Sequence, residues 1–127
     1  FSDFIQTSLH GADFTEASMV GCRLSSVFLF NTKFDKADLS DSIMTGLRNF
    51  SNESIHASFK EAKLVNVDFR GSDLKGANFT GADLRDTDFY NCDFTNANLT
   101  DATGFNPDQP GIIFNNTTMP DGTVRTD

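Results

Sequence analysis

Few residues in this sequence are able to do covalent or metal chemistry. Among its 127 residues are two cysteines, Cys22 and Cys92, and two histidines, His10 and His56. A thiol beside an imidazole can form a nucleophilic pair, and several such side chains together can bind a metal ion. Either site requires the fold to bring distant residues within bonding distance, so the elements that would position them must be identified first.

A repeat of five residues dominates the sequence. In residues 76–99, GANFTGADLRDTDFYNCDFTNANL, a large apolar residue recurs at every fifth position from Phe79 to Leu99. This period fits neither the alternation of a strand nor the 3.6-residue period of a helix. The same frame runs from Phe4 to Met44 and resumes at Phe59. The fold is therefore built from an internal repeat.

Two further positions of each five-residue block are constrained. The second residue before the large one is usually small, as at Ala77 and Ala82, and in an extended chain it points to the same side as the large residue. The second residue after the large one is commonly Gly, Asn or Asp, which accept the positive φ angles of tight turns. We expect each block to form a short extended side followed by a corner, so that the chain coils around its apolar side chains.

A longer period indicates the number of sides per coil. Every fourth small position in one set is alanine: Ala17, Ala37, Ala57, Ala77 and Ala97. This pattern predicts coils of four sides and 20 residues, and it places Phe59 above Leu39 in the stack.

The motif A-[DN]-[LF]-x-x, seen as ANFTG at 77–81, ADLRD at 82–86 and ANLTD at 97–101, resembles the pentapeptide-repeat family. The resemblance covers residues 2 to about 102. It implies an all-β fold, a right-handed quadrilateral parallel β-helix, with about five full coils of 20 residues plus a partial C-terminal coil. We expect residues 1–102 to form this β-helix and the C-terminal loop and partial coil, 103–127, to act as a cap.

The frame is interrupted within MTGLRNFSNESIHASF, residues 44–59. It places Asn49 and Ser54 at inward positions, while Phe50 and Ile55 lie one residue late. Either the polar pair enters the core, or the chain slips outward by one residue and Phe50 and Ile55 face inward. We favour the slip, because leaving two large apolar side chains exposed forfeits ~1.5–3 kcal/mol each. The slip requires a bulge near residues 45–49.

The coil arrangement separates the reactive side chains. It places Cys22 and Cys92 on different walls of distant coils, beyond the ~7 Å limit for a disulfide, so both are expected to be buried free thiols. His10 and His56 fall on different walls at outward or corner positions, where no catalytic or metal-binding set can converge. We therefore expect no catalytic residue, no cofactor and no metal site, and an enzyme is only a remote alternative.

The strongest functional lead is a set of outward-facing aromatic and arginine side chains on one wall, since such side chains often mark protein contact sites. The set comprises Phe28, Phe30, Arg48, Phe50, Arg70 and Tyr90. It predicts a non-enzymatic interaction or scaffold solenoid with an unidentified protein partner. We expect a monomer or an end-to-end dimer.

The resemblance implies a second candidate function, because some pentapeptide-repeat proteins resemble duplex DNA in shape and charge and bind DNA gyrase. The net charge of −8 fits such mimicry. However, an outward acidic column of Asp13, Glu53, Asp73 and Asp93 gives one carboxylate per coil, or one per ~4.8 Å. Duplex DNA carries one charge per ~1.7 Å, so we rank mimicry second.

Composition argues against other classes of protein. The excess of 18 Asp and Glu over 10 Lys and Arg disfavours direct binding to nucleic acid or to an anionic membrane. No apolar run approaches the ~20 residues of a membrane helix, so no membrane insertion is expected. The resemblance extends to short proteins of cyanobacteria and plastids. It leaves the compartment open between the cytoplasm and, if a leader has been removed, the periplasm or thylakoid lumen.

Overall fold

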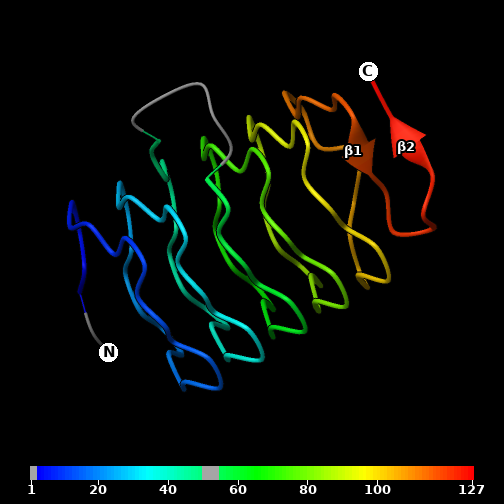
Figure 1. Ribbon diagram of the computed structural model, residues 1–127. Coiled ribbons are helices and arrows are strands. Elements are labelled where there is room, and N and C mark those ends of the chain that lie inside the picture. Colours follow the sequence, from blue (N-terminus) through cyan, green and yellow to red (C-terminus); the bar gives the residue numbers. More distant parts are fainter. Residues whose placement is uncertain (1–2, 50–54) are drawn as a thin grey trace.

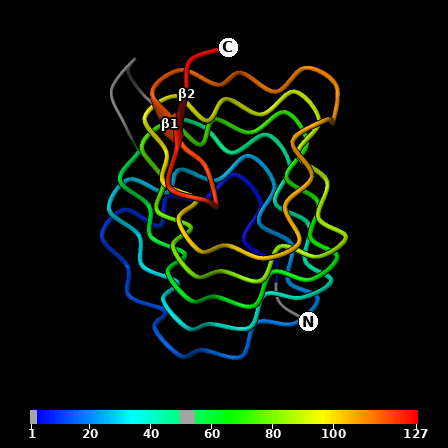
Figure 2. The same cartoon turned by 90° about the vertical axis from the view of Figure 1, so that its right-hand side faces the viewer.

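The chain folds as a solenoid. The computed structural model describes residues 3–49 and 55–127. Figure 1 shows coils lying side by side from the blue N-terminal end to the red C-terminal end. In the view turned by 90°, successive coils overlap around one common interior (Figure 2). The five-residue repeat thus forms a β-helical stack, as predicted.

Parallel β-bridges join neighbouring coils at the residue just before the large apolar residue of each block. Asp3 bridges Arg23, and Arg23 in turn bridges Ile43, so that bridged residues are 20 apart. Because one residue per side pairs in this way, extended segments stay short. Among the described residues, the strands longer than a single bridge are β1 (Thr117–Thr118) and β2 (Val124–Arg125), which pair antiparallel.

Each block ends in a corner at the predicted position. The backbone N–H of Thr7 donates to the carbonyl of Phe4 at 3.2 Å, which closes a four-residue turn, and the later blocks repeat this bond. The second residue after the large one has a φ near +60°, at Asn31 (58°) and also at Lys36 (59°). The predicted corner conformation is confirmed, and the stack imposes it even on residue types that rarely adopt it.

Parallel stacks of phenylalanine rings fill the interior. Phe34 lies between Phe14 and Phe59, with ring centroids 5.3 and 5.1 Å away and planes tilted by 9° and 7°. Phe79 continues this column 4.9 Å above Phe59. The rings of Phe34, Phe59 and Phe79 are fully buried. Each ring contact adds about 0.5–1.5 kcal/mol to the stabilisation from burial.

One step between coils is longer than the others. Lys33 bridges Ser58 and Ile43 bridges Asp68, so the bridged residues here are 25 apart instead of 20. The prediction of uniform 20-residue coils is wrong at this step. The extra length equals one repeat, and the blocks on both sides therefore keep the same inward and outward positions.

The longer step changes which residues stack on one another. Phe59 lies above Phe34, whereas the uniform period had predicted that it would lie above Leu39. The alanine column is also corrected, because bridges one residue further along join residues 38, 63 and 83. The column that the structure forms is Ala17, Ala37, Ala62, Ala82 and Ala102. Stacked positions beyond the step are thus shifted by one side relative to the sequence-based assignment.

Of the two apolar residues that the slip would turn inward, the structure describes Ile55, and it supports the slip there. Ile55 is buried, with 1% of its surface exposed. Asn49, which the uninterrupted frame places inward, is half-buried. The corresponding predictions for Phe50 and Ser54 lie outside the described residues. An isoleucine therefore occupies the core where the frame alone would have placed a serine.

The two ends of the stack differ. At the C-terminal end Phe105 packs against Phe89, Phe94 and Phe114 with centroid distances of 5.5, 5.6 and 6.3 Å. Arg125 covers the outer ring, with its Cζ 4.1 Å from the centroid of Phe114. At the N-terminal end the inward Phe4, Leu9 and Phe14 of the first coil are only half-buried. Within residues 3–49 and 55–127, no helix is long and apolar enough to cross a membrane.

Candidate interaction surface

The structure gathers three of the predicted contact residues into one cluster. Phe28 bridges Arg48, whose guanidinium Cζ lies 5.8 Å from the ring centroid of Phe28. Phe30 belongs to the same block and meets His10 and His56 edge-on, at centroid distances of 5.0 and 5.8 Å. Both phenylalanines are half-buried and Arg48 is exposed. These five residues are called the aromatic cluster below.

The other described residues of the predicted wall lie on the neighbouring side. The carbonyl of Arg70 accepts from the N–H of Gly46, and that of Tyr90 accepts from the N–H of Gly71, which places both in a column of their own. The 25-residue step moves this column away from Phe30. The single wall predicted from the uniform period is therefore two adjacent groups. Tyr90 is 45% exposed and Arg70 is exposed as well.

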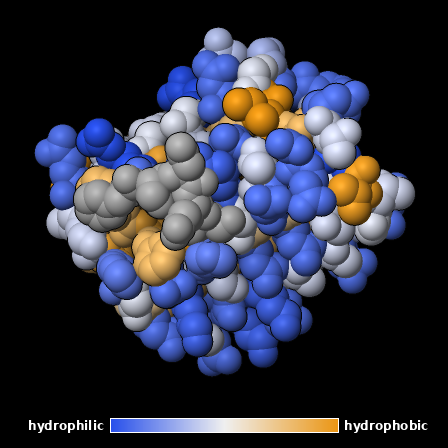
Figure 3. All heavy atoms as spheres, turned by 45° about the horizontal axis from the view of Figure 1, so that its top comes forward, coloured by the Kyte–Doolittle hydropathy of each residue, from blue (hydrophilic) through white to orange (hydrophobic). Residues whose placement is uncertain are grey.

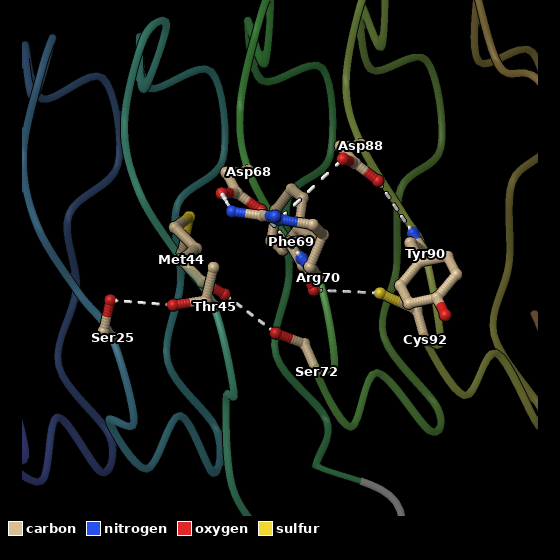
Figure 4. Close-up of polar contacts among 10 residues, drawn as sticks. All are labelled: Ser25, Met44, Thr45, Asp68, Phe69, Arg70, Ser72, Asp88, Tyr90 and Cys92. Carbon is tan, nitrogen blue, oxygen red and sulfur yellow. Dashed lines mark hydrogen bonds and ion pairs between the residues drawn. The ribbon is translucent and has the colours of Figure 1, made fainter. Parts of the chain in front are cut away.

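Arg70 neutralises the acids around it. Its Nη2 lies 2.7 Å from Asp68 Oδ2, and its Nε lies 3.8 Å from Asp88 Oδ2 in the next coil (Figure 4). The hydrogen bond from Arg70 holds the pKa of the Asp68 carboxyl below its usual value. The side chain of Arg70 is thus committed to these two carboxylates, which makes it a weaker contact residue than its exposure suggests.

The same pairing recurs wherever an Asp and a cation flank one large apolar residue. Lys75 Nζ lies 3.2 Å from Asp73 Oδ2, and Arg85 Nη2 lies 2.7 Å from Asp83 Oδ2. This arrangement is readable in the sequence as Asp-x-Arg or Asp-x-Lys within one block. Lys60 has Ser58 at the corresponding position, and no carboxylate of the described residues forms an ion pair with it. The five-residue period alone does not reveal which cations are paired.

The reactive side chains do not assemble into a catalytic or metal site in the described part of the chain. No group of three or more His, Cys, Asp or Glu side chains is placed to hold a metal ion there. His10 and His56 lie on either side of Phe30, so their assignment to different walls is wrong. Cys22 and Cys92 are both buried and unbridged, as predicted.

Cys92 serves as a small core residue. Its Sγ donates to the carbonyl of Phe69 at 2.9 Å, just as Ser72 Oγ one coil earlier donates to the carbonyl of Met44 at 2.8 Å (Figure 4). Burial raises the pKa of the Cys92 thiol to about 12. Because the thiolate is the nucleophile, this thiol is inert at neutral pH.

Two hollows lie against the C-terminal loop. One, of about 380 Å³, is lined mainly by apolar side chains, including Phe105, Pro107 and Met119. The other, of about 300 Å³, is lined by polar residues, including Asp86, Asp88 and Asn106.

On the face drawn in Figure 3, hydrophilic residues predominate and hydrophobic ones form small separate groups. The aromatic cluster is therefore the feature that best fits a contact site.

A solenoid with one large apolar residue in every five belongs to the class of β-helical repeat proteins, in which each repeat packs against its neighbours. The family model for pentapeptide repeats matches in eight copies, at residues 1–29, 7–46 and 62–101. The chain belongs to the pentapeptide-repeat family. The stretch between these matches, 47–61, contains the segment over which the 25-residue step occurs.

Two solved structures with TM-scores above 0.5 support the same fold. A trypsin-treated variant of QnrB1, a plasmid-mediated fluoroquinolone resistance protein, is similar with a TM-score of 0.61 and 16% identity, covering 93% of this chain and 71% of that one. Full-length QnrB1 gives a TM-score of 0.56 at 16% identity, over 92% and 74% of the two chains. A pentapeptide repeat protein from the thylakoid lumen of Arabidopsis thaliana is 26% identical over 94% and 69%, with a TM-score of 0.38. A search of curated proteins found no match.

Proposed function

We propose that this chain is a non-catalytic solenoid that binds a protein partner through its aromatic cluster. The observation that carries the proposal is the position of Phe28 and Phe30, which face outward from a stack whose other outward positions are mostly polar or charged. Aromatic side chains next to an arginine are typical of the residues that dominate protein interfaces. The family model that matches describes a structural repeat and not a catalytic family.

The resemblance to the family further supports a right-handed quadrilateral form with about five coils. We infer that residues 1–102 form the repeat body and that residues 103–127 act as its cap. Packing of Phe105 on Phe94 and of the Arg125 guanidinium on Phe114 supports this role. The choice between a monomer and an end-to-end dimer stays a prediction.

The proposed function is tested with the double variant Phe28→Asp/Phe30→Asp. Bait protein is used to capture partners from cells of the native organism, and bound proteins are quantified by mass spectrometry. A double variant Tyr90→Asp/Ile113→Asp is the control, because these side chains are also apolar and exposed, at 45% and 53%. We expect a discrete partner to be retained by wild type and control and lost from the first variant.

Circular dichroism must show that both variants keep the wild-type fold. Capture that is unchanged by Phe28→Asp/Phe30→Asp in a folded protein would reject the aromatic cluster as the contact site.

Mimicry of DNA has less support as the function of this chain. The acidic column predicted from the sequence is divided, because Asp13 bridges Lys33 whereas Asp73 bridges Asp93 on the neighbouring side. The carboxylate of Asp73 is also paired with Lys75. The likeness to QnrB1 at 16% identity concerns the fold alone. A DNA gyrase supercoiling assay is the direct test, and inhibition by micromolar protein would promote mimicry over the contact-site proposal.

A further inference from the structure

We propose that the C-terminal end of the stack is a second protein-binding site, at which a basic segment of a partner adds to β2 as an extended strand. An apolar side chain of this segment enters the neighbouring hollow of about 380 Å³. The site combines an unpaired strand edge, an apolar hollow on the same face and a concentration of negative charge. It is separate from the aromatic cluster and goes beyond the proposed function.

The strand β2 is the outermost one of its sheet. Thr118 of β1 bridges Asn98 in the coil below, and β1 pairs with β2 on its other side. Figure 1 shows β2 beyond β1 at the C-terminal end of the stack. Within residues 3–49 and 55–127, no strand or bridge pairs with the other edge of β2. An unpaired edge of this kind is a template for the addition of an extended segment.

The backbone groups on the unpaired edge belong to Val124. The N–H of Thr118 donates to the carbonyl of Ala97 at 3.0 Å, and its carbonyl accepts from the N–H of Leu99 at 2.8 Å. Both groups of Thr118 thus point away from β2, so its pair with Val124 is a non-hydrogen-bonded one. The N–H and carbonyl of Val124 therefore point outward, and its residue is 59% exposed. Residues 123–126 include neither lysine nor proline, which commonly block the addition of a strand.

The apolar hollow lies on one face of this edge. The N–H of Met119 donates to the carbonyl of Thr123 at 2.7 Å, so these two residues lie opposite each other. Both line the hollow, together with side chains that include Phe105 and Pro107. Successive side chains of a strand point to opposite faces. Every second side chain of a strand added to β2 would therefore lie on the face of the hollow, where an aliphatic or aromatic side chain fits best.

Negative charge is concentrated at this end of the chain. Residues 86–127 contain seven aspartates and one arginine, a net charge of −6 out of −8 for the whole chain, and they contain no lysine. The arginine, Arg125, is already paired with Asp127 at 3.2 Å, and its guanidinium lies over the ring of Phe114. Such an end attracts a positively charged segment and speeds its encounter with the chain.

Asp121 places a carboxylate at the hollow itself. Its Oδ1 accepts from the hydroxyl of Thr123 at 2.6 Å and from the N–H of Thr123 at 3.0 Å. These hydrogen bonds hold the pKa of the Asp121 carboxyl below its usual value, so it is ionised at neutral pH. No lysine or arginine of the described residues forms an ion pair with it. A lysine or arginine of the added segment can therefore pair with Asp121.

A basic segment suits this edge better than a second copy of the chain. Pairing of β2 with β2 of another copy would bring together two ends that each carry a net charge of −6 over residues 86–127. These like charges repel each other, and they would repel a phosphate backbone as well. A basic polypeptide meets both the charge of this end and the hydrogen-bonding groups of Val124.

The test begins with a selection from a phage-displayed library of random peptides, about 12 residues long, against the wild-type chain. We expect the selected peptides to be rich in Lys and Arg, with an aliphatic or aromatic residue among them. Each backbone nitrogen of the best peptide is then methylated in turn, because methylation removes one hydrogen-bond donor. Fluorescence anisotropy should show a loss of affinity of about tenfold at alternate positions and of less than about threefold between them. Saturating peptide should also slow hydrogen exchange of the Val124 N–H, followed by NMR, at least about tenfold.

A matched pair of variants tests the charge at the hollow. Asp121→Asn is compared with Asp13→Asn, because Asp13 Oδ1 likewise accepts from the N–H and the hydroxyl of Thr15, at 2.9 and 2.5 Å. Each variant keeps the accepting oxygen and removes one negative charge. We expect the affinity for the peptide to fall about threefold in Asp121→Asn and to stay close to that of wild type in Asp13→Asn. An equal loss in both variants would overturn the inference.

Other results would also overturn it. These are the failure to select any peptide, the selection of neutral or acidic peptides, methylation effects without a period of two, and unchanged exchange at Val124. A dimer of the chain in which the Val124 N–H is protected without peptide would assign the edge to a second copy. The variant Phe28→Asp/Phe30→Asp should bind the peptide as wild type does, and loss of binding there would assign the peptide to the aromatic cluster. Failure of the peptide test leaves the proposed function standing, because capture through the aromatic cluster does not involve β2.

Discussion

Replacing Phe34 and Phe59 by leucine, singly and together, tests the 25-residue step on which the surface assignment depends. A Phe-to-Leu exchange keeps an apolar side chain in the core but removes the ring and leaves a small cavity. Phe59 also loses its ring contacts with Phe34, Phe69 and Phe79, at 5.1, 5.7 and 4.9 Å. At about 0.5–1.5 kcal/mol for each of these three ring pairs, the loss of the ring contacts alone should lower the unfolding free energy of the single variant by about 1.5–4.5 kcal/mol.

The double-mutant cycle isolates the contact between the two rings. We expect a coupling energy of about 0.5–1.5 kcal/mol between Phe34 and Phe59, measured by urea unfolding followed by circular dichroism. The control cycle pairs Phe59→Leu with Leu39→Ala, and its coupling should be smaller than that of the Phe34 cycle, because Leu39 lies on the neighbouring side, under Leu64. A uniform 20-residue step would put Phe59 on Leu39. A larger coupling in the control cycle than in the Phe34 cycle would therefore refute the register and the grouping of the aromatic cluster.

Three further predictions concern the C-terminal segment, a surface ion pair and a buried thiol. Gly104→Ala should destabilise the chain to urea more than Gly11→Ala. Both glycines have φ near +70°, where a residue with a Cβ costs about 1–2 kcal/mol. Of the two, only Gly104 would place the new Cβ 2.6–2.8 Å from Arg85 in the preceding coil. Arg70 lowers the pKa of Asp68, so their pair should stabilise the fold above the ordinary carboxyl pKa of about 3.9. This stabilisation should be lost as the pH falls through the lower pKa of the folded state. The urea midpoints of wild type and Arg70→Gln should therefore converge near pH 2. Cys92, with a pKa of about 12, should resist a thiol-reactive dye at pH 8 until urea unfolds the chain, and rapid labelling of the folded protein would contradict its burial.

The sequence predicts the fold well because one period controls both the core and the corners. A large residue such as Phe79 or Leu84 marks each side, and residues such as Asn31 mark the turns, so the inward and outward positions follow from local chemistry. The length of each coil is not fixed in this way. An insertion of one whole repeat preserves the periodic pattern on both sides, and hydrophobic periodicity cannot detect it. The contact of Phe59 with Phe34 reveals it only in three dimensions.

The composition of the candidate site depends on the length of each coil, which hydrophobic periodicity cannot detect. The site was therefore predicted less completely than the fold. Phe28, Phe30 and Arg48 precede the longer step and lie on one side of the stack, whereas Arg70 and Tyr90 follow it and lie on the adjacent side. In a solenoid, the neighbours of a surface residue are set by the total length of the intervening coil, while its burial is set by its place in the repeat. Adding one repeat consequently changes the neighbours of surface residues, while the blocks on either side keep their inward and outward positions. The contact of Phe30 with His56 across the longer step, at a centroid distance of 5.8 Å, is a surface neighbour that coil length determines and that the five-residue pattern does not reveal.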